Sequence, residues 1–148
     1  MIEVQRYSEE FAKELLPLLR KNWRESPSYE EGLEADPDFE MYRRLDQAGV
    51  LLCLTLRDTN TRKLVGYVVY VVSPSTHHRT ITVGRGDVMY VETEFRGKAK
   101  EMLMTAERFL RARGCKRLGW SVDRDGRLHR LLLSVGFYED EVILEKKL

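Results

Sequence analysis

The run of residues 64–72 carries almost only apolar side chains and is followed at once by Ser73-Pro74-Ser75. A strand that is apolar at nearly every position is buried on both faces, so it belongs inside a sheet that helices cover on each side. The run is also far shorter than the roughly 20 residues that a membrane-spanning helix needs. The chain must therefore supply helices for both faces of this strand, and we expect no membrane partner.

Helical and extended patterns alternate along the rest of the chain. Apolar spacing predicts one helix from a Ser8 cap to about Trp23 and another from an Asp38 cap to a stop at Gly49. Later helices are predicted between Lys100 and Gly114 and over residues 128–133. Strands are predicted over residues 2–6, 50–56, 64–72, 80–91, 118–122 and 137–144. This order, with antiparallel strands followed by β-α-β crossovers, predicts an α/β (α+β) fold with a mixed sheet.

Composition restricts the class of protein. The 148 residues suit one domain spanning residues 1–148, and the net charge of +1 gives no overall field to attract nucleic acid. Cys53 and Cys115 form no CxxC motif, and no His/Cys cluster has metal-ligand spacing, so we expect reduced core thiols and no metal. The first residues lack an apolar signal core, which favours a cytoplasmic protein.

The segment 87–100 is where the sequence indicates chemistry. A strand ends, the basic stretch Arg96-Gly97-Lys98-Ala99-Lys100 follows, and a helix begins. Amides at a helix N-terminus carry partial positive charge, and a glycine lets the backbone approach phosphate oxygens closely. The segment therefore indicates a pyrophosphate site, with a solvated basic turn as the alternative interpretation.

Several segments together resemble the GNAT (Gcn5-related N-acetyltransferase) superfamily. They are Leu64-Val65-Gly66-Tyr67, Met89-Tyr90-Val91, Arg96-Gly97-Lys98-Ala99 and Val135-Gly136-Phe137. The resemblance implies a mostly antiparallel sheet of six to seven strands flanked by about four helices, and acetyl-coenzyme A as co-substrate. It also implies a pantetheine contact along Met89, Tyr90 and Val91, a pyrophosphate contact at Arg96, Gly97, Lys98, Ala99 and Lys100, and frequent homodimers.

A narrower resemblance is to GNAT proteins of tailed phages and prophages. It is carried by Leu16-Pro17-Leu18-Leu19, Trp23-Arg24-Glu25, residues 38–42 and the pair His77-His78.

The chain departs from the family pattern in two places. The loop fits best with Gly97 and Ala99 in the two small positions, which makes it two residues tighter than usual and keeps Glu101 away from the pyrophosphate. Many members carry a tyrosine acid four residues before the glycine of the Gly-Phe pair, and that position here is Leu132.

Four side chains are candidates for proton transfer. Asp87, expected on the same face as Met89 and Val91, is a candidate base, with an ion pair to a nearby arginine as the alternative. His78 is a candidate proton relay, with an inert histidine in an exposed loop as the alternative. Glu25 lies at the end of the first helix, near the acceptor site that the resemblance implies. Tyr138 is close in sequence to the position of the missing acid but lies past the turn.

Two functions follow from the sequence. The first is an N-acetyltransferase in which a primary amine attacks the thioester directly in a ternary complex, because no nucleophile for a covalent intermediate is evident. The acidic stretch 25–40 favours a cationic acceptor, either a small molecule or a lysine side chain. The second is a catalytically degenerate GNAT-fold binding module that serves as a virion or regulatory component.

Overall fold

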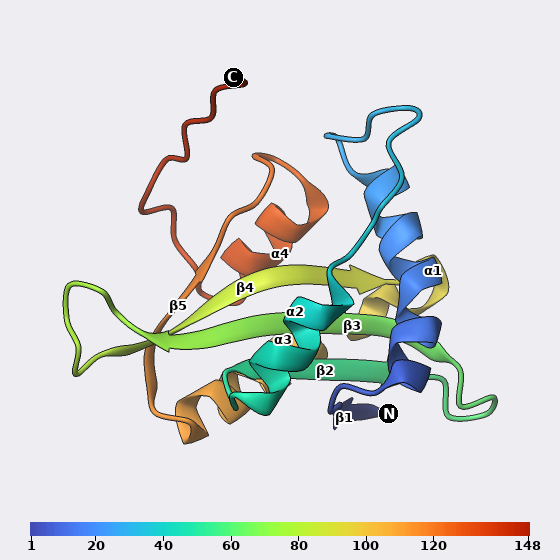
Figure 1. Cartoon of the computed structure of the whole chain (residues 1–148), viewed down its shortest axis with the longest axis horizontal. Coiled ribbons are helices and arrows are strands. Elements are labelled where there is room, and N and C mark those ends of the chain that lie inside the picture. The colour runs from blue at the N-terminus through green and yellow to red at the C-terminus, as the bar shows by residue number, and fades with distance from the viewer.

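The computed structural model describes all 148 residues and contains a single mixed sheet with the strand order β1-β2-β3-β4-β5 (Figure 1). The strands are β1 (Ile2–Val4), β2 (Leu51–Arg57), β3 (Leu64–Pro74), β4 (Thr82–Val91) and β5 (Cys115–Trp120). The helices are α1 (Glu9–Glu25), α2 (Phe39–Gln47), the 3₁₀ helix η1 (Thr93–Lys98), α3 (Ala99–Ala112) and α4 (Arg127–Ser134). Strands β1 to β4 are antiparallel, and α3 carries the chain back to β5, which pairs parallel to β4. The predicted mixed α/β fold is confirmed.

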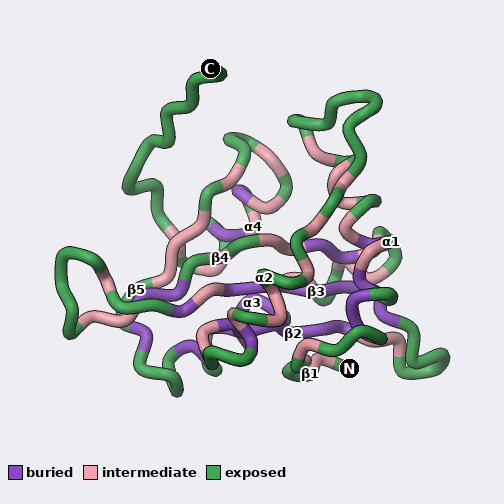
Figure 2. The backbone as a smooth tube through the Cα atoms, viewed as in Figure 1, coloured by how far each residue is buried: buried purple, intermediate pink, exposed green.

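Helices cover β3 on both sides, as its apolar sequence predicts (Figure 2). On one face, α1 and α2 pack against side chains that include Tyr67 and Tyr90. On the other, α3 and α4 pack against side chains that include Val68 and Tyr70. The two apolar clusters are separated by the sheet, and β4 contributes to both of them.

The helix ends follow the sequence. Ser8 accepts a hydrogen bond from the Phe11 amide at 3.1 Å, and Asp38 accepts one from the Met41 amide at 2.9 Å, so both predicted caps are confirmed. Gly114 ends α3 with a φ of 85°, a conformation that glycine adopts without steric cost.

Strands β4 and β5 separate before β4 ends. Their pairing runs from Thr82 and Cys115 to Gly86 and Trp120, whereas β4 continues to Val91 (Figure 1). The Trp120 ring lies directly against Gly86, where an added Cβ would stand 2.0 Å from Trp120 Cε2. Trp120 therefore marks the point at which the two strands diverge.

A hydrogen bond holds that ring in place, and its loss is expected to cost stability. Trp120 Nε1 donates to the Tyr70 hydroxyl at 2.8 Å. In Tyr70→Phe the indole N–H loses its partner, so the free energy of unfolding should fall by about 1–2 kcal/mol. Urea unfolding measures the change, and Tyr138→Phe, at an exposed tyrosine, should leave stability unchanged.

The sheet has five strands, so the predicted count of six to seven is wrong, and residues 137–144 do not form the predicted last strand. Phe137 packs against the core, but Val142 and Leu144 are exposed, and the segment runs away from the sheet (Figure 1). Apolar residues favour a strand only where a neighbouring strand accepts their backbone hydrogen bonds. Here Glu139 accepts a hydrogen bond from His129 Nε2 at 2.8 Å, and this contact holds the segment beside α4 instead of along β5.

Candidate active site

The end of β4 presents unpaired backbone groups to the gap that β5 leaves. The Glu92 amide donates to the Val65 carbonyl at 2.8 Å, and hydrogen-bonded pairs alternate along an antiparallel ladder. Tyr90 is therefore bonded to β3, whereas Met89 and Val91 direct their backbone groups to the opposite edge. Arg96 Nε donates to the Val91 carbonyl at 3.2 Å, which leaves the Met89 groups and the Val91 N–H facing the gap.

Beyond this edge, η1 leads directly into α3. Gly97 lies in η1 with a φ outside the left-handed region, and nothing lies within 4 Å of the place where its Cβ would be. Neither the backbone conformation nor packing requires glycine here, so the open space above Gly97 fits the close approach of a ligand. Lys98 pairs with the exposed Glu101 at 2.8 Å, and Lys100 is exposed, so both cations and the first turn of α3 border the same space.

Asp87 faces the opposite side of the sheet from Met89. Val69 pairs with Val88 and Tyr70 pairs with Gly86, so Asp87 is the extra residue of a β-bulge. The bulge breaks the alternation on which the sequence prediction depended. Asp87 accepts a hydrogen bond from Tyr42 of α2 at 3.1 Å, in place of the expected arginine ion pair.

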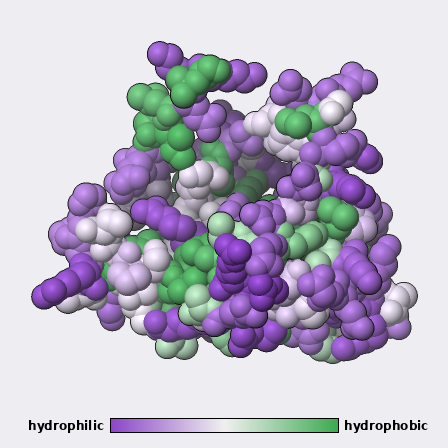
Figure 3. Space-filling model, viewed as in Figure 1, coloured by the Kyte–Doolittle hydropathy of each residue, from purple (hydrophilic) through white to green (hydrophobic).

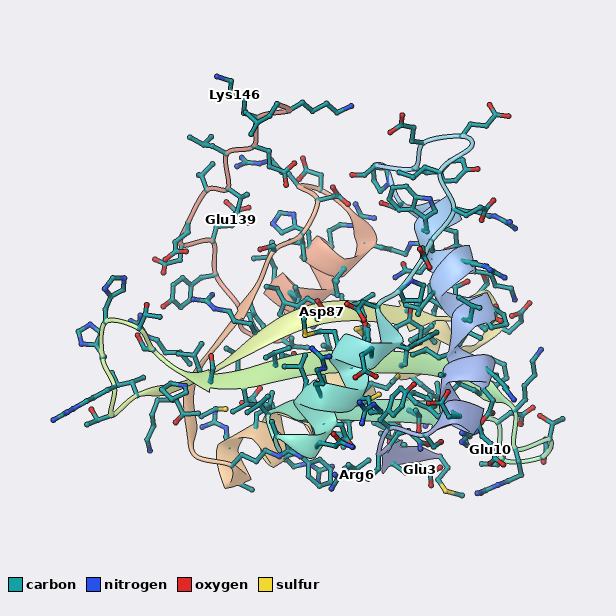
Figure 4. The ribbon with its side chains drawn as sticks, in the orientation of Figure 1. Glu3, Arg6, Glu10, Asp87, Glu139 and Lys146 are labelled. Carbon is teal, nitrogen blue, oxygen red and sulfur yellow. The ribbon has the colours of Figure 1, made fainter.

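The surroundings of Asp87 are open to solvent on one side. Burial and the adjacent Asp87 carboxylate raise the pKa of Tyr42, so its hydroxyl stays protonated and acts as the donor. The surface is hollowed between the C-terminal segment and the loop after α1 (Figure 3), and Asp87 lies below this hollow in the same view, on the α2 side of the sheet (Figure 4). The carboxylate is exposed, so a ligand in the hollow can reach it.

Glu25, the last residue of α1, joins several elements beside the end of β4. Its carboxylate accepts from Arg96 at 2.6 Å and from the Tyr90 hydroxyl at 3.2 Å, and Arg127 of α4 lies 3.9 Å away. Burial and the Glu25 charge raise the pKa of Tyr90 to about 12, so the phenol donates. Tyr90, expected to contact the cofactor, is bonded to β3 through its backbone and to Glu25 through its hydroxyl.

The structure does not bring the other two candidates to this place. His78 lies in the loop between β3 and β4, at the far end of β4 from Val91 (Figure 1). Tyr138 is 74% exposed and lines a groove beside β5. Burial raises the pKa of Cys53 to about 12, so this thiol is not a nucleophile.

Two residues of the site were missed by the sequence analysis. Tyr42 of α2 contacts Asp87, and Arg127 of α4 lies near Glu25, so both come from elements distant in sequence from the residues that they meet. The one available signal was the position of Tyr42 on the apolar side of its predicted helix, where a buried phenol needs a hydrogen-bond partner.

Known proteins share this architecture. The chain aligns over its full length with a ribosomal-protein-alanine N-acetyltransferase from Brucella melitensis biovar Abortus 2308, at 20% identity and a TM-score of 0.73, covering 99% of that chain. An aminoglycoside 6'-N-acetyltransferase from Acinetobacter baumannii is 20% identical with a TM-score of 0.70, covering 99% of this chain and 98% of the other. A glucosamine-6-phosphate N-acetyltransferase from Arabidopsis thaliana is 12% identical with a TM-score of 0.72, covering 99% of this chain and 98% of the other. At these identities the likeness shows the fold alone.

The family follows from the sequence match. None of the curated proteins that were compared matches the chain. The family model described as "Acetyltransferase (GNAT) family" matches residues 11–137, which include α1, the divergence of β4 and β5, the η1–α3 junction and α4. With most of its length matched in this way, the chain belongs to the acetyltransferase (GNAT) family.

Proposed function

We propose that the protein transfers an acetyl group from acetyl-coenzyme A to a primary amine, by direct attack in a ternary complex. The observation that carries the proposal is the open edge of β4 at Met89 and Val91, which leads to the open space at Gly97. An extended arm bearing amides fits such an edge, and a pyrophosphate fits a glycine at the start of a helix. When bound, acetyl-coenzyme A supplies the activated thioester.

The backbone of the chain performs the binding in this proposal. The Met89 and Val91 amides pair with the pantetheine arm and polarise the thioester carbonyl. The Ala99 amide donates to the Arg96 carbonyl, so the pyrophosphate is held by close approach to the backbone at Gly97 and by the positive charge of Lys98 and Lys100. Lys98 must exchange its contact with the exposed Glu101 for one with the phosphate, at little cost because the existing pair is solvated.

Asp87 is the proposed base, acting directly or through water. Its carboxylate lies on the α2 side of β4, with the Tyr42 hydroxyl fixing one oxygen and solvent reaching the group. An amine entering the hollow meets this carboxylate and the acidic stretch that follows α1, which favours a cationic acceptor. The three structural relatives named above are all N-acetyltransferases by name, which supports an amine.

A catalytically degenerate binding module is the second candidate. The observation that favours it is Leu132, at the place of the family's tyrosine acid, which is 3% exposed and belongs to the apolar core. No side chain replaces the acid there. Direct transfer is still compatible with this, because positioning the amine against the thioester supplies much of the rate.

The first test is calorimetric titration with acetyl-coenzyme A. We expect wild-type protein to bind and Gly97→Asp to bind at least about tenfold more weakly, because the new carboxylate meets the pyrophosphate. Thr76→Asp adds the same charge in the β3–β4 loop and should bind as wild type does. Thiol release with a panel of primary amines then separates an enzyme from a binding module.

Failure of the folded wild type to bind would overturn the proposed function. Equal binding by Gly97→Asp would instead show that the loop is not the pyrophosphate site.

A further inference from the structure

Arg96 is adjacent to Gly97 in sequence, and its charge is already paired. Its Nε donates to the Val91 carbonyl at 3.2 Å, and its terminal nitrogen donates to Glu25 at 2.6 Å. The first contact fixes the stem of the side chain beside the end of β4. The second directs the free end of the guanidinium to a carboxylate, although a phosphate binds the same group equally well.

Glu25 has three cationic or hydrogen-bonding partners, each from a different element. In addition to Arg96, it accepts from the Tyr90 hydroxyl at 3.2 Å and lies 3.9 Å from Arg127 of α4. Arg96 belongs to η1, which follows β4, and Arg127 belongs to α4, which follows β5. Glu25 therefore neutralises positive charge from the elements that follow both strands bordering the gap.

We propose that Glu25 competes with the pyrophosphate of coenzyme A for Arg96. Binding of the coenzyme draws Arg96 from Glu25 to the phosphate, and the released carboxylate then faces the cationic acceptor. This inference rests on the proposed function, and it assigns Glu25 a role in coupling the two ligands. No covalent bond changes in this step.

The exchange is feasible because the Glu25–Arg96 pair is neither buried nor rigid. The side chains of Arg96 and Glu25 are 29% and 40% exposed, so their pairing contributes little free energy and can be replaced. After the exchange, Tyr90 still holds one oxygen of Glu25, on the side of β4 that faces α1 and α2. Asp87 lies on that same side, so two carboxylates then face an incoming amine.

The coupling has a thermodynamic consequence. A ligand that releases Glu25 raises the affinity for a cation at Glu25, and a cation at Glu25 raises the affinity for the coenzyme by the same factor. Each of the two ligands therefore binds more tightly when the other is already bound. If Glu25 only oriented Arg96, it would strengthen the contact of Arg96 with the phosphate. Removal of the Glu25 charge would then lower the affinity for the coenzyme.

The test measures the dissociation constant of coenzyme A by calorimetry for a set of variants. Glu25→Gln should bind about threefold to fivefold more tightly than wild type, because it frees Arg96 from a partly exposed pair. Arg96→Gln should bind coenzyme A about tenfold more weakly than wild type. The double variant Arg96→Gln/Glu25→Gln should have a dissociation constant within about twofold of that of Arg96→Gln.

The matched control is Glu34→Gln, which removes the same charge from a nearby residue whose partner is Arg24, at 3.5 Å. It should bind coenzyme A as wild type does. Thermal unfolding of each variant verifies that it is folded.

The outcomes separate the two proposals. Absence of binding by the wild type would overturn the proposed function. Binding by the wild type together with equal or weaker binding by Glu25→Gln would overturn only the competition. The competition would also be overturned if Glu25→Gln tightened binding in the Arg96→Gln background as well, or if Glu34→Gln tightened binding. Either result would show a general effect of charge.

Discussion

Replacing Asp87 with asparagine is expected to lower kcat by about 100-fold to 10,000-fold, the range that a positioned general base contributes. The amide keeps the shape of the carboxylate and can still accept the Tyr42 hydrogen bond, but it cannot take a proton from the amine. The backbone edge at Met89 and Val91 is unchanged, so the affinity for acetyl-coenzyme A should stay that of the wild type. Thiol release, measured with the amine that reacts fastest in the panel, gives kcat.

Tyr42→Phe is the control for this variant. It removes the hydrogen bond that orients Asp87 but keeps the carboxylate, so kcat should fall by no more than about tenfold. If Asp87→Asn keeps a kcat within threefold of the wild-type value, Asp87 is not the base, and proximity with water accounts for the proton transfer.

Gly86→Ala is expected to destabilise the fold by about 2–3 kcal/mol, the cost of forcing an extra group into a packed site. The new Cβ would stand 2.0 Å from the Trp120 ring, which must move and give up its bond to Tyr70. Because Trp120 marks the divergence of β4 and β5, the binding edge should be disturbed together with stability. Urea unfolding at equilibrium measures the free energy.

Gly97→Ala is the matched substitution at an unpacked glycine. Nothing lies within 4 Å of its Cβ position, so stability should stay within about 0.5 kcal/mol of wild type. Similar stabilities for the two alanine variants would mean that Trp120 adjusts without cost and does not fix the point of divergence.

The fold could be predicted where local chemistry decides the structure. The apolar run that became β3 required helices on both faces, and the caps at Ser8 and Asp38 set the starts of α1 and α2. The absence of a strand over residues 137–144 could not be predicted in this way. The apolar residues of this segment satisfy the strand pattern, but the contact of Glu139 with His129 is a tertiary interaction that the pattern does not contain.

The candidate site shows the same division. The junction of β4 with η1 and α3 is a backbone feature, so the order of elements was sufficient to predict it. The face occupied by Asp87 depends on a bulge, and the bulge depends on how β3 and β4 are paired. The partners of Glu25 come from three other elements, so only the folded chain brings them together.

The bulge at Asp87 also means that one short strand serves two compartments. A molecule along the Met89 edge lies in the gap beside β5, whereas a molecule at Asp87 lies on the α2 side of the sheet. In the proposed reaction the two reactants would therefore lie on different sides of β4 and meet only at their reacting ends.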